Sequence, residues 1–501
     1  MRKNVKFAAV IAAVLGVLVG LSIFNHSIST NEREINIAVP TDPDSFDPTY
    51  SVAAATAEIA FNIYEGLVKS TPDGQVVGAL ASHWEIDSSL TKYTFFLREA
   101  YFHNGKLVTP DDVVNSINRA RDPKISQRAS RYQAIKDVYA DEDRIIIVLK
   151  EPYAPLLYEL TELSAVIYPK DADGLANKPI GTGPYKFVEW RPNQYIKLTR
   201  YAEHWSKQSP YYKDVYFRIM PDTNTVVLSI KTGVIDLIPR LEADYLHQVE
   251  SDAKLKVQSA PMNLVQILAV NNAHPVLKDK RVRQAIAMAI DRDEIIYGAA
   301  WGQGDKIFSG LSPAMPEFFH NQLEEVLPYN PDQAQQLLSE AGYSDLELTI
   351  DLPSAYPLHV QTGEIIADQL SRVGINVNIQ IIEWGTWLER VYNQRDYELT
   401  VTGLTGKLDP HTILSRYVST EPKNFTNFNN PEFDQLIKQG VGVLAAERTQ
   451  IYKKAQEILT EDVAGVFIMD PKQLTVTKND IYGWQNYPVY VIDVASLYKH
   501  K

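Results

Sequence analysis

The spacing of apolar residues changes near residue 262. Before it, KYTFFL (92–97) alternates with the period of a strand, and RIIIVLK (144–150) has the composition of another. After it, helices that stop at glycine, such as NPDQAQQLLSEAG (330–342), alternate with apolar strands such as INVNIQII (375–382). Strand–helix–strand order with apolar strands indicates a covered, parallel or mixed sheet. We therefore expect an α/β protein with a lobe boundary near residue 262.

Length and charge narrow the class of protein further. A single hydrophobic core stops growing at about 250–300 residues, so a chain of 501 residues needs two or three lobes. The net charge of −13 argues against nucleic acid as a partner, because phosphate binding needs a basic surface. The chain has no cysteine, which excludes disulfides, thiolate metal sites and a lipid-modified cysteine.

The N-terminus has the pattern of an export signal. Three basic residues within the first six precede an apolar run without charge, residues 7–24. This run of roughly 18 residues reaches about 27 Å as a helix, close to the hydrocarbon thickness of a bilayer. Residues 1–30 are therefore either a cleaved signal peptide or an anchor. We expect an exported protein, periplasmic or held through residues 7–24 at the outer face of the inner membrane.

The sequence contains no recognisable catalytic motif. It lacks H-E-x-x-H, G-x-S-x-G and any cysteine nucleophile. Metal ligation needs several convergent donors, yet His274, His320, His359 and His411 are scattered singly. We therefore expect a protein that is not an enzyme and has no catalytic residues, no metal ligands and no cofactor.

Six segments resemble, in collinear order, the family 5 extracellular solute-binding proteins, which deliver peptides, nickel complexes and other solutes to ABC importers. Together they extend over nearly everything that follows the expected export signal. The segments are PDSFDPTYS (43–51), LASHWEIDSSLTKYTFFLREAYFHNGKLVTPDDVVNS (80–116), IGTGPYKFVEW (180–190), KTGVIDLI (231–238), LAVNNAHPVLKDKRVRQAIAMAIDRDEII (268–296) and YNPDQAQQLLSEAGY (329–343).

The resemblance implies a two-lobed periplasmic-binding-protein fold, similar to class II, with a discontinuous first lobe. The first lobe would include residues 35–262 with an extra subdomain at about 75–178, the second lobe residues 263–472, and residues 473–501 would return to the first lobe. The implied protein is a monomer that closes over its solute and contacts the permease subunits of an ABC transporter.

The resemblance also implies the class of solute, namely peptides or peptide-like anions. Several alternatives remain open on the same fold: a binding protein for a nickel chelate, an opine or an oligosaccharide, or a membrane-anchored sensor. The nickel-binding branch is considered because DPHTILSRY (409–417) resembles one of its motifs. However, the segment expected to supply an arginine for the chelate's carboxylates, residues 159–169, contains none.

Two aromatic residues are candidates for solute contact. In peptide-binding members a tryptophan in an E-W-x-x-[YFW]-L context touches the ligand, and Trp384 is the residue in that context here. The alternative is that Trp384 packs in the core. An indole ring at the end of a strand can also do both, with one face against the core and the other against a ligand. Tyr356 is a second candidate, on a loop (353–359) that lacks the arginine of the dipeptide-binding pattern.

The run Gly403 to Lys407 departs from the peptide-binding pattern. Those members have Gly-Trp, two residues, and an aspartate that pairs with the ligand's amine; here Leu404 replaces the tryptophan and Lys407 replaces the aspartate. A lysine there would repel an ammonium group and favour a carboxylate. We include Leu404, Thr405, Gly406, Lys407 and Asp409 in the candidate site; the alternative for Lys407 is an exposed loop position without a ligand role.

Overall fold

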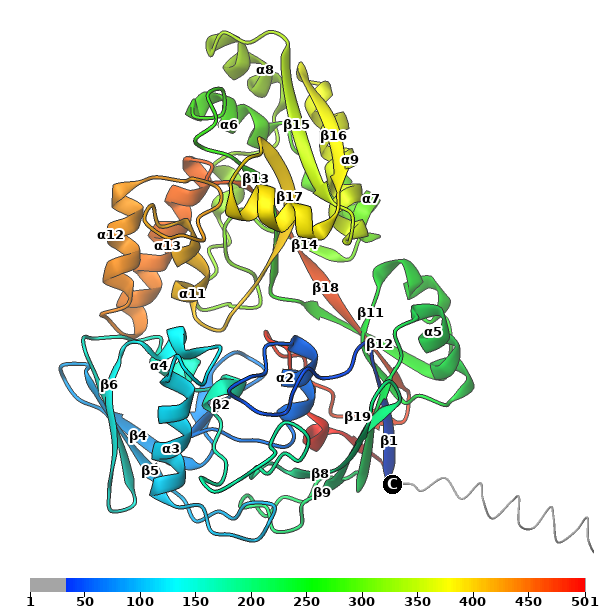
Figure 1. Ribbon diagram of the computed structural model, residues 1–501. Helices are drawn as coiled ribbons and strands as arrows, with labels where there is room; N and C mark the ends of the chain where they lie inside the picture. Colours follow the sequence, from blue (N-terminus) through cyan, green and yellow to red (C-terminus); the bar gives the residue numbers. More distant parts are fainter. Residues whose placement is uncertain (1–32, 501) are drawn as a thin grey trace, which may run out of the picture.

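The computed structural model describes residues 33–500 and has the expected α/β architecture with two lobes (Figure 1). The expected signal or anchor, residues 1–30, lies outside the described residues. Within residues 33–500, none of the helices has the length and apolar character needed to cross a bilayer. We use "first lobe" for residues 35–262 with 473–501 and "second lobe" for residues 263–472.

One large mixed sheet extends through both lobes. Its neighbouring strands are, in order, β16 (Ile375–Ile382), β15 (Leu346–Pro353), β17 (Leu399–Thr405), β13 (Leu264–Val270), β18 (Val466–Lys478), β11 (Leu237–Leu241), β1 (Glu34–Val39), β10 (Asp214–Ile219), β9 (Tyr195–Arg200) and β8 (Tyr185–Arg191), while β12 (Leu255–Pro261) and β14 (Gly304–Lys306) pair with β18. The first lobe therefore holds one end of this sheet and the second lobe the other.

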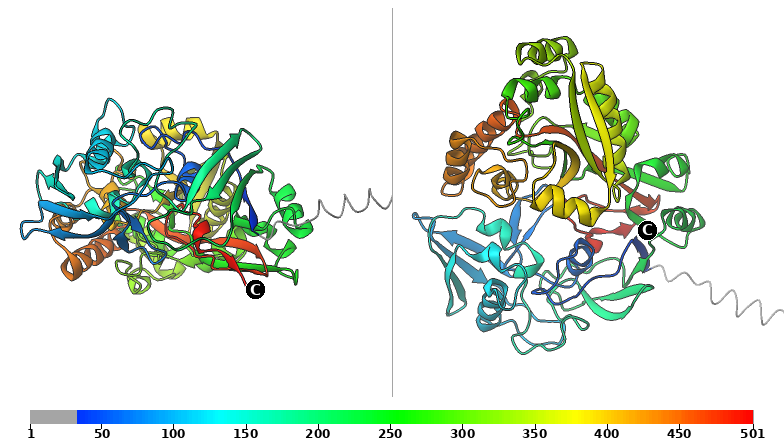
Figure 2. Two further views of the ribbon diagram at one scale, coloured as in Figure 1. Left: turned by 90° about the horizontal axis from the view of Figure 1, so that it is seen from below. Right: turned by 45° about the horizontal axis from the view of Figure 1, so that its top comes forward.

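Two adjacent segments connect the lobes. The long strand β18 pairs with β12 in the first lobe and with β13 in the second, and β12 leads directly into β13 (Figures 1 and 2). Between them, the carboxylate of Asp470 accepts backbone N–H groups from Met262, Asn263 and Leu264 at 3.0–3.1 Å. These three hydrogen bonds fix the backbone where the chain crosses from the first lobe to the second.

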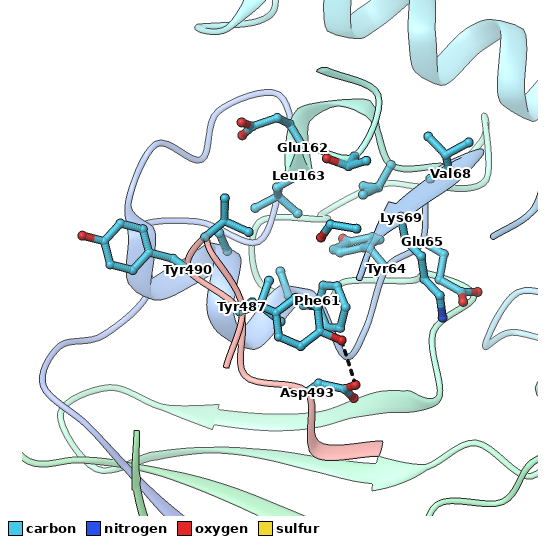
Figure 3. Close-up of a pocket in the computed structure, with 18 of the residues that line it drawn as sticks. Phe61, Tyr64, Glu65, Val68, Lys69, Glu162, Leu163, Tyr487, Tyr490 and Asp493 are labelled. Atoms are coloured by element: carbon cyan, nitrogen blue, oxygen red, sulfur yellow. Dashed lines mark hydrogen bonds between the residues drawn. The ribbon is translucent and has the colours of Figure 1, made fainter. Parts of the chain in front are cut away.

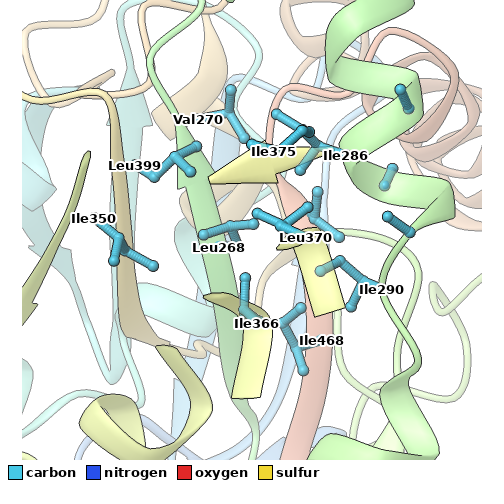
Figure 4. Close-up of a cluster of buried hydrophobic side chains, with 14 of the residues drawn as sticks. Leu268, Val270, Ile286, Ile290, Ile350, Ile366, Leu370, Ile375, Leu399 and Ile468 are labelled. Carbon is cyan, nitrogen blue, oxygen red and sulfur yellow. The ribbon is translucent and has the colours of Figure 1, made fainter. Parts of the chain in front are cut away.

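The second lobe is built from the strand–helix–strand units that the sequence predicts. β15 runs parallel to both β16 and β17. Apolar side chains of these strands pack against Ile366 and Leu370 of helix α9 (Figure 4). The helices of this lobe are α6 (Lys280–Met288), α7 (Arg292–Ala300), α8 (Pro331–Glu340), α9 (Pro357–Ser371), α10 (Trp384–Thr386), α11 (Pro410–Leu414), α12 (Pro431–Gly440) and α13 (Ala445–Glu461), with a π-helical turn η5 (Trp387–Asn393) after α10.

The first lobe carries a separate antiparallel sheet of four strands, in the order β4-β5-β7-β6. Helix α3 covers it and begins with a capping box, in which Thr109 and Asp112 each accept the other's backbone N–H. The elements of this region and its neighbours are α2 (Ala54–Ala60), β2 (Val68–Ser70), β3 (Val76–Gly78), β4 (Ala81–Ile86), β5 (Lys92–Leu97), α3 (Pro110–Arg121), η1 (Ala129–Tyr132), β6 (Ile135–Asp141), β7 (Arg144–Leu149), α4 (Leu156–Glu159), η2 (Leu163–Ala165) and α5 (Thr223–Thr232).

The C-terminal segment packs on the first lobe. Ile492 and Val494, which follow β18 in the chain, are held by Asn62. The Asn62 side chain donates to Ile492 O at 2.8 Å and accepts the Val494 N–H at 3.0 Å. The short strands β19 (Ile481–Tyr482) and β20 (Tyr498–Lys499) pair antiparallel in this segment. Residues distant in sequence, near 62 and near 490, therefore come together beside the cleft.

Candidate functional site

A cavity of about 1030 Å³ lies between the lobes. Most of its wall comes from the first lobe, and the second lobe contributes residues 405–408 and Arg416. The first-lobe wall comes from parts of residues 51–70, 128–131, 161–166, 204–210 and 487–496 together with Arg98 and Pro184. Clefts of about 300–1000 Å³ enclose most of the surface of a drug-sized ligand, so the cavity has room for a solute of that size.

Aromatic rings form one wall of the cavity. Phe61 from the turn after α2 packs against Tyr487 from the C-terminal segment, with ring centroids 5.6 Å apart (Figure 3). The Tyr487 hydroxyl donates to Asp493 at 3.1 Å, which fixes this ring. Tyr64 donates to Phe46 O at 3.1 Å. Because these hydroxyls are satisfied within the protein, the rings offer the solute mainly apolar surface.

A second wall holds a carboxylate whose oxygens are already bonded. Glu65 accepts Trp205 Nε1 at 2.7 Å and Thr182 Oγ1 at 3.0 Å, and its other oxygen lies 3.3 Å from His204 Nε2. Burial alone would raise the pKa of Glu65, but the hydrogen bond and charge of His204 lower it overall. Glu65 therefore orients Trp205, and the guanidinium of Arg98 stacks 3.9 Å from that ring's centroid.

The second-lobe part of the wall is a short loop after β17. The Gly406 N–H donates to Asn263 O at 2.7 Å, and Asn263 Nδ2 donates to Lys407 O at 3.3 Å and to Pro488 O at 2.7 Å. A Cβ atom at Gly406 would lie 2.0 Å from Asn263 Oδ1, so only glycine fits. The crossing between the lobes thus fixes the loop that carries Lys407.

Lys407 lies in the wall and is paired across the cleft. Its Nζ is 3.4 Å from Glu162 Oε1, in the first lobe, and Arg131 Nη1 is 2.8 Å from the same oxygen. All three side chains are partly buried, with 20–31% of their surface exposed. Burial lowers the pKa of Lys407, while Glu162 opposes this shift; burial raises the pKa of Glu162, but Lys407 and Arg131 lower it overall.

The cavity is cationic although the chain is acidic. Its lining contains six lysine and arginine residues and three carboxylates, and each of the carboxylates is bonded to a neighbouring side chain. The six cations are Lys69, Arg98, Arg128, Arg131, Lys407 and Arg416. The potential inside such a cleft is focused by its low-dielectric walls, so the cavity favours negatively charged groups.

The structure brings three of the seven candidate residues into this wall, namely Thr405, Gly406 and Lys407. Trp384 and Tyr356 do not line the cavity. They form an aromatic cluster on the second lobe, where Trp384 stacks on Trp387 with centroids 4.9 Å apart and meets Tyr356 edge-on at 5.0 Å. Leu404 is half-buried and packs between two apolar clusters of the second lobe.

Asp409 is buried in the second lobe and does not line the cavity. Both of its carboxylate oxygens lie 2.7 Å from guanidinium nitrogens of Arg448, and it caps α11 by accepting the His411 N–H at 2.8 Å. With the two side chains only 2% and 4% exposed, this ion pair has a structural role. Asp409 and Lys407 are therefore close in the sequence, but only Lys407 lines the cavity.

Sequence reasoning missed the first-lobe residues that face Lys407. Glu162, Arg128 and Arg131 lie some 245 to 280 positions before it, so only the arrangement of the two lobes in the fold brings them together. The segment 159–169 lacks an arginine, as noted from the sequence, but Arg131 on η1 reaches the same place. Within residues 33–500, no three histidine or acidic side chains are grouped as metal ligands would be.

Comparisons with known proteins agree with this geometry. The sequence profile described as "Bacterial extracellular solute-binding proteins, family 5 Middle" matches residues 75–425. The chain is 26% identical to the oligopeptide-binding protein AppA of Bacillus subtilis, over 89% of this chain and 88% of that protein. It is 29% identical to heme-binding protein A of Haemophilus influenzae, over 81% and 80% of the two chains.

A solved structure extends the likeness to the fold. The periplasmic binding protein DppA of Helicobacter pylori, in complex with the peptide STSA, superposes with a TM-score of 0.76 at 26% identity, over 93% of this chain and 98% of that one. The resemblance read from the six segments is therefore confirmed, as is the two-lobed α/β fold. A profile match over more than half of the residues shows that this chain belongs to the family 5 bacterial extracellular solute-binding proteins.

Proposed function

We propose that this protein captures a short peptide or a peptide-like anion outside the cytoplasm and delivers it to an ABC importer. The observation that carries the proposal is the cationic cavity of about 1030 Å³, whose wall combines residues of both lobes. A solute bound there contacts both lobes at once, so its binding favours closure about the crossing near Asn263 and Asp470.

The relatives support a peptide as the solute. The names of two of them, the Bacillus oligopeptide-binding protein and the Helicobacter protein in complex with STSA, refer to peptides. The cavity offers both kinds of surface that a peptide needs: aromatic rings at Phe61 and Tyr487 for side chains, and cations for carboxylates. Another relative is named a heme-binding protein, so hemin is included in the test below.

The candidate residues take two roles in this proposal. Thr405 contacts the solute from the end of β17, and Gly406 and Lys407 contact it from the loop that follows, with Lys407 selecting for negative charge. Trp384 begins the helical segment α10–η5, the yellow helix on the side of the second lobe that faces the first lobe in Figure 1, and Tyr356 contacts Trp384. In this proposal both rings stack on the solute after the lobes close. Asp409 does not contact the solute; its buried ion pair with Arg448 holds the chain next to the loop in place.

The remaining expectations complete the proposal. The first lobe is discontinuous, residues 35–262 and 473–501, with its extra subdomain at about 75–178, and residues 263–472 form the second lobe. The N-terminal run, residues 7–24, exports the protein and either is cleaved or holds it at the outer face of the inner membrane. The monomer then docks on the permease subunits of the transporter.

A thermal-shift screen tests the proposal. The chain without residues 1–30 is mixed with di- to pentapeptides, free and N-acetylated, and with hemin, nickel–histidine, opines and oligosaccharides. A ligand of the native state at a hundred times its Kd stabilises it by about 2.7 kcal/mol, which is readily measured. We expect peptides with a free carboxylate to give the largest shifts. Shifts with another class and none with peptides would overturn the proposal.

A further inference from the structure

Three cations and one carboxylate of the cavity wall come together from the two lobes. Lys407 comes from the second lobe and pairs with Glu162 of the first, which also pairs with Arg131; Arg128, also from the first lobe, is near enough to Lys407 for its charge to lower the pKa of that lysine. We propose that these three cations form a carboxylate-binding subsite that a negatively charged group of the solute completes when the lobes close. This inference rests on the proposed function and specifies which group of the solute is recognised, and where.

The arrangement at Glu162 leaves donors free. Lys407 and Arg131 both approach the same oxygen, Oε1, at 3.4 Å and 2.8 Å. An ammonium has three donors and a guanidinium five, so one shared oxygen satisfies only a small part of their capacity. Glu162 is thus a positioning residue, which holds the two cations beside each other without saturating them.

Arg128 adds a third positive charge without an acidic partner. Its guanidinium donates to Val52 O at 2.9 Å, which fixes its position, and among the described residues it forms no ion pair. Three cations and one carboxylate leave a local surplus of two positive charges. Consistent with this, burial lowers the pKa of Lys407, and the charges of Arg131 and Arg128 lower it further, so a second carboxylate would relieve the repulsion.

The placement of the cations links recognition to closure. A carboxylate has two oxygens and about four lone-pair positions, enough to accept hydrogen bonds from Lys407 on one lobe and from Arg128 or Arg131 on the other. Such a bridge exists only when the lobes are together, so the bound anion stabilises the closed state. An ammonium in the same place would meet three like charges and is excluded.

Calorimetric titration with matched peptides tests this subsite. The first pair is acetyl-Ala-Ala-Ala with a free C-terminal carboxylate and the same peptide as a C-terminal amide. The second pair is acetyl-Ala-Glu-Ala amide and acetyl-Ala-Gln-Ala amide, which separates a side-chain carboxylate from a terminal one. For the wild type we expect a tenfold to hundredfold preference for the acid in at least one pair, the usual value of charged hydrogen bonds.

Variants locate the preference. Lys407→Gln and Arg128→Gln should reduce it to about threefold or less, because each removes a donor and a charge, whereas Lys407→Arg should keep most of it. The control is Lys136→Gln, which removes the same charge from an exposed position of β6 outside the cavity. Equal unfolding temperatures of all variants establish that they are folded. A preference unchanged in both Gln variants would overturn the inference.

A second measurement decides the subsite without any peptide. Millimolar succinate should raise the unfolding temperature of the wild type and of Lys136→Gln, but not of Lys407→Gln or Arg128→Gln; equal shifts in all four proteins, or none in the wild type, would overturn the inference. If peptides bind but acids and amides bind equally, the subsite is refuted while the peptide receptor stands. If no peptide binds, the proposed function fails, and the succinate series still decides the subsite.

Discussion

The ion pair between Asp409 and Arg448 allows a quantitative prediction about the support of the binding loop. Asp409 follows Lys407 by two residues, and its carboxylate is 2% exposed while Arg448 is 4% exposed. Asp409→Ala removes the only carboxylate within ion-pairing distance of this guanidinium among the described residues. The arginine, which also donates to Gly440 O at 2.9 Å, then stays buried with an uncompensated charge.

The expected loss of stability follows from that geometry. Removing one partner of a buried ion pair destabilises a protein by about 3–5 kcal/mol, because the other charge stays desolvated. Loss of the N-cap on α11 adds about 1 kcal/mol, since Asp409 also accepts the His411 N–H. We therefore expect Asp409→Ala to lower the free energy of unfolding by about 4–6 kcal/mol.

Urea unfolding followed by tryptophan fluorescence measures this loss, with the m value as a check that the same surface unfolds. The control is Asp141→Ala, which breaks an exposed pair with Arg144 of similar length, 2.6 Å, and should cost at most about 1 kcal/mol. A loss of less than about 1 kcal/mol in Asp409→Ala, together with an altered order of solute affinities, would refute the structural role and return Asp409 to the binding site.

Three further predictions concern pH, the loop and the aromatic cluster. Burial raises the pKa of Glu159 to about 8, so between pH 4.5 and 8 the folded state keeps a proton that the unfolded state releases. The free energy of unfolding should therefore fall with rising pH in this range, by up to about 1.4 kcal/mol per pH unit. Urea midpoints measured against pH should show this fall in the wild type and a flatter profile in Glu159→Gln. Gly406→Ala forces a Cβ against Asn263 and should weaken solute binding in calorimetry, whereas Gly442→Ala, where the nearest atom is 3.8 Å away, should not. Trp384→Ala should lower solute affinity about tenfold through lost stacking, and an unchanged Kd would remove Trp384 from the site.

The secondary structure of the second lobe could be predicted because local signals and tertiary packing agree there. The glycine-stopped helix expected over 330–342 is α8 (Pro331–Glu340), and the apolar strand expected over 375–382 is β16 with the same bounds. Helix α9 begins at Pro357, because proline is tolerated at the first helical position, where its missing N–H leaves no intrahelical hydrogen bond unmade.

The site could be predicted only where it follows a strand directly. Thr405 is the last residue of β17 and Gly406 and Lys407 follow it directly, and the end of a strand is a position from which loops reach a cleft. Asp409, two residues further on, is already turned into the lobe by its role as a helix cap. Neither Glu162 nor Arg131 carries a local signal of a binding role, because their contact with Lys407 depends on how the two lobes are placed in the fold.

The meaning of Lys407 therefore depends on more than its own charge. Peptide-binding members of the family have an aspartate at this position, so Lys407 by itself would exchange one negative charge for one positive charge. In the structure Glu162 offsets that charge from the opposite lobe, and Arg131 and Arg128 then exceed it. Because electrostatic selection acts through the summed field of such a cluster, the anion preference that we propose would belong to four residues on two lobes. Neither lobe carries all four of these residues.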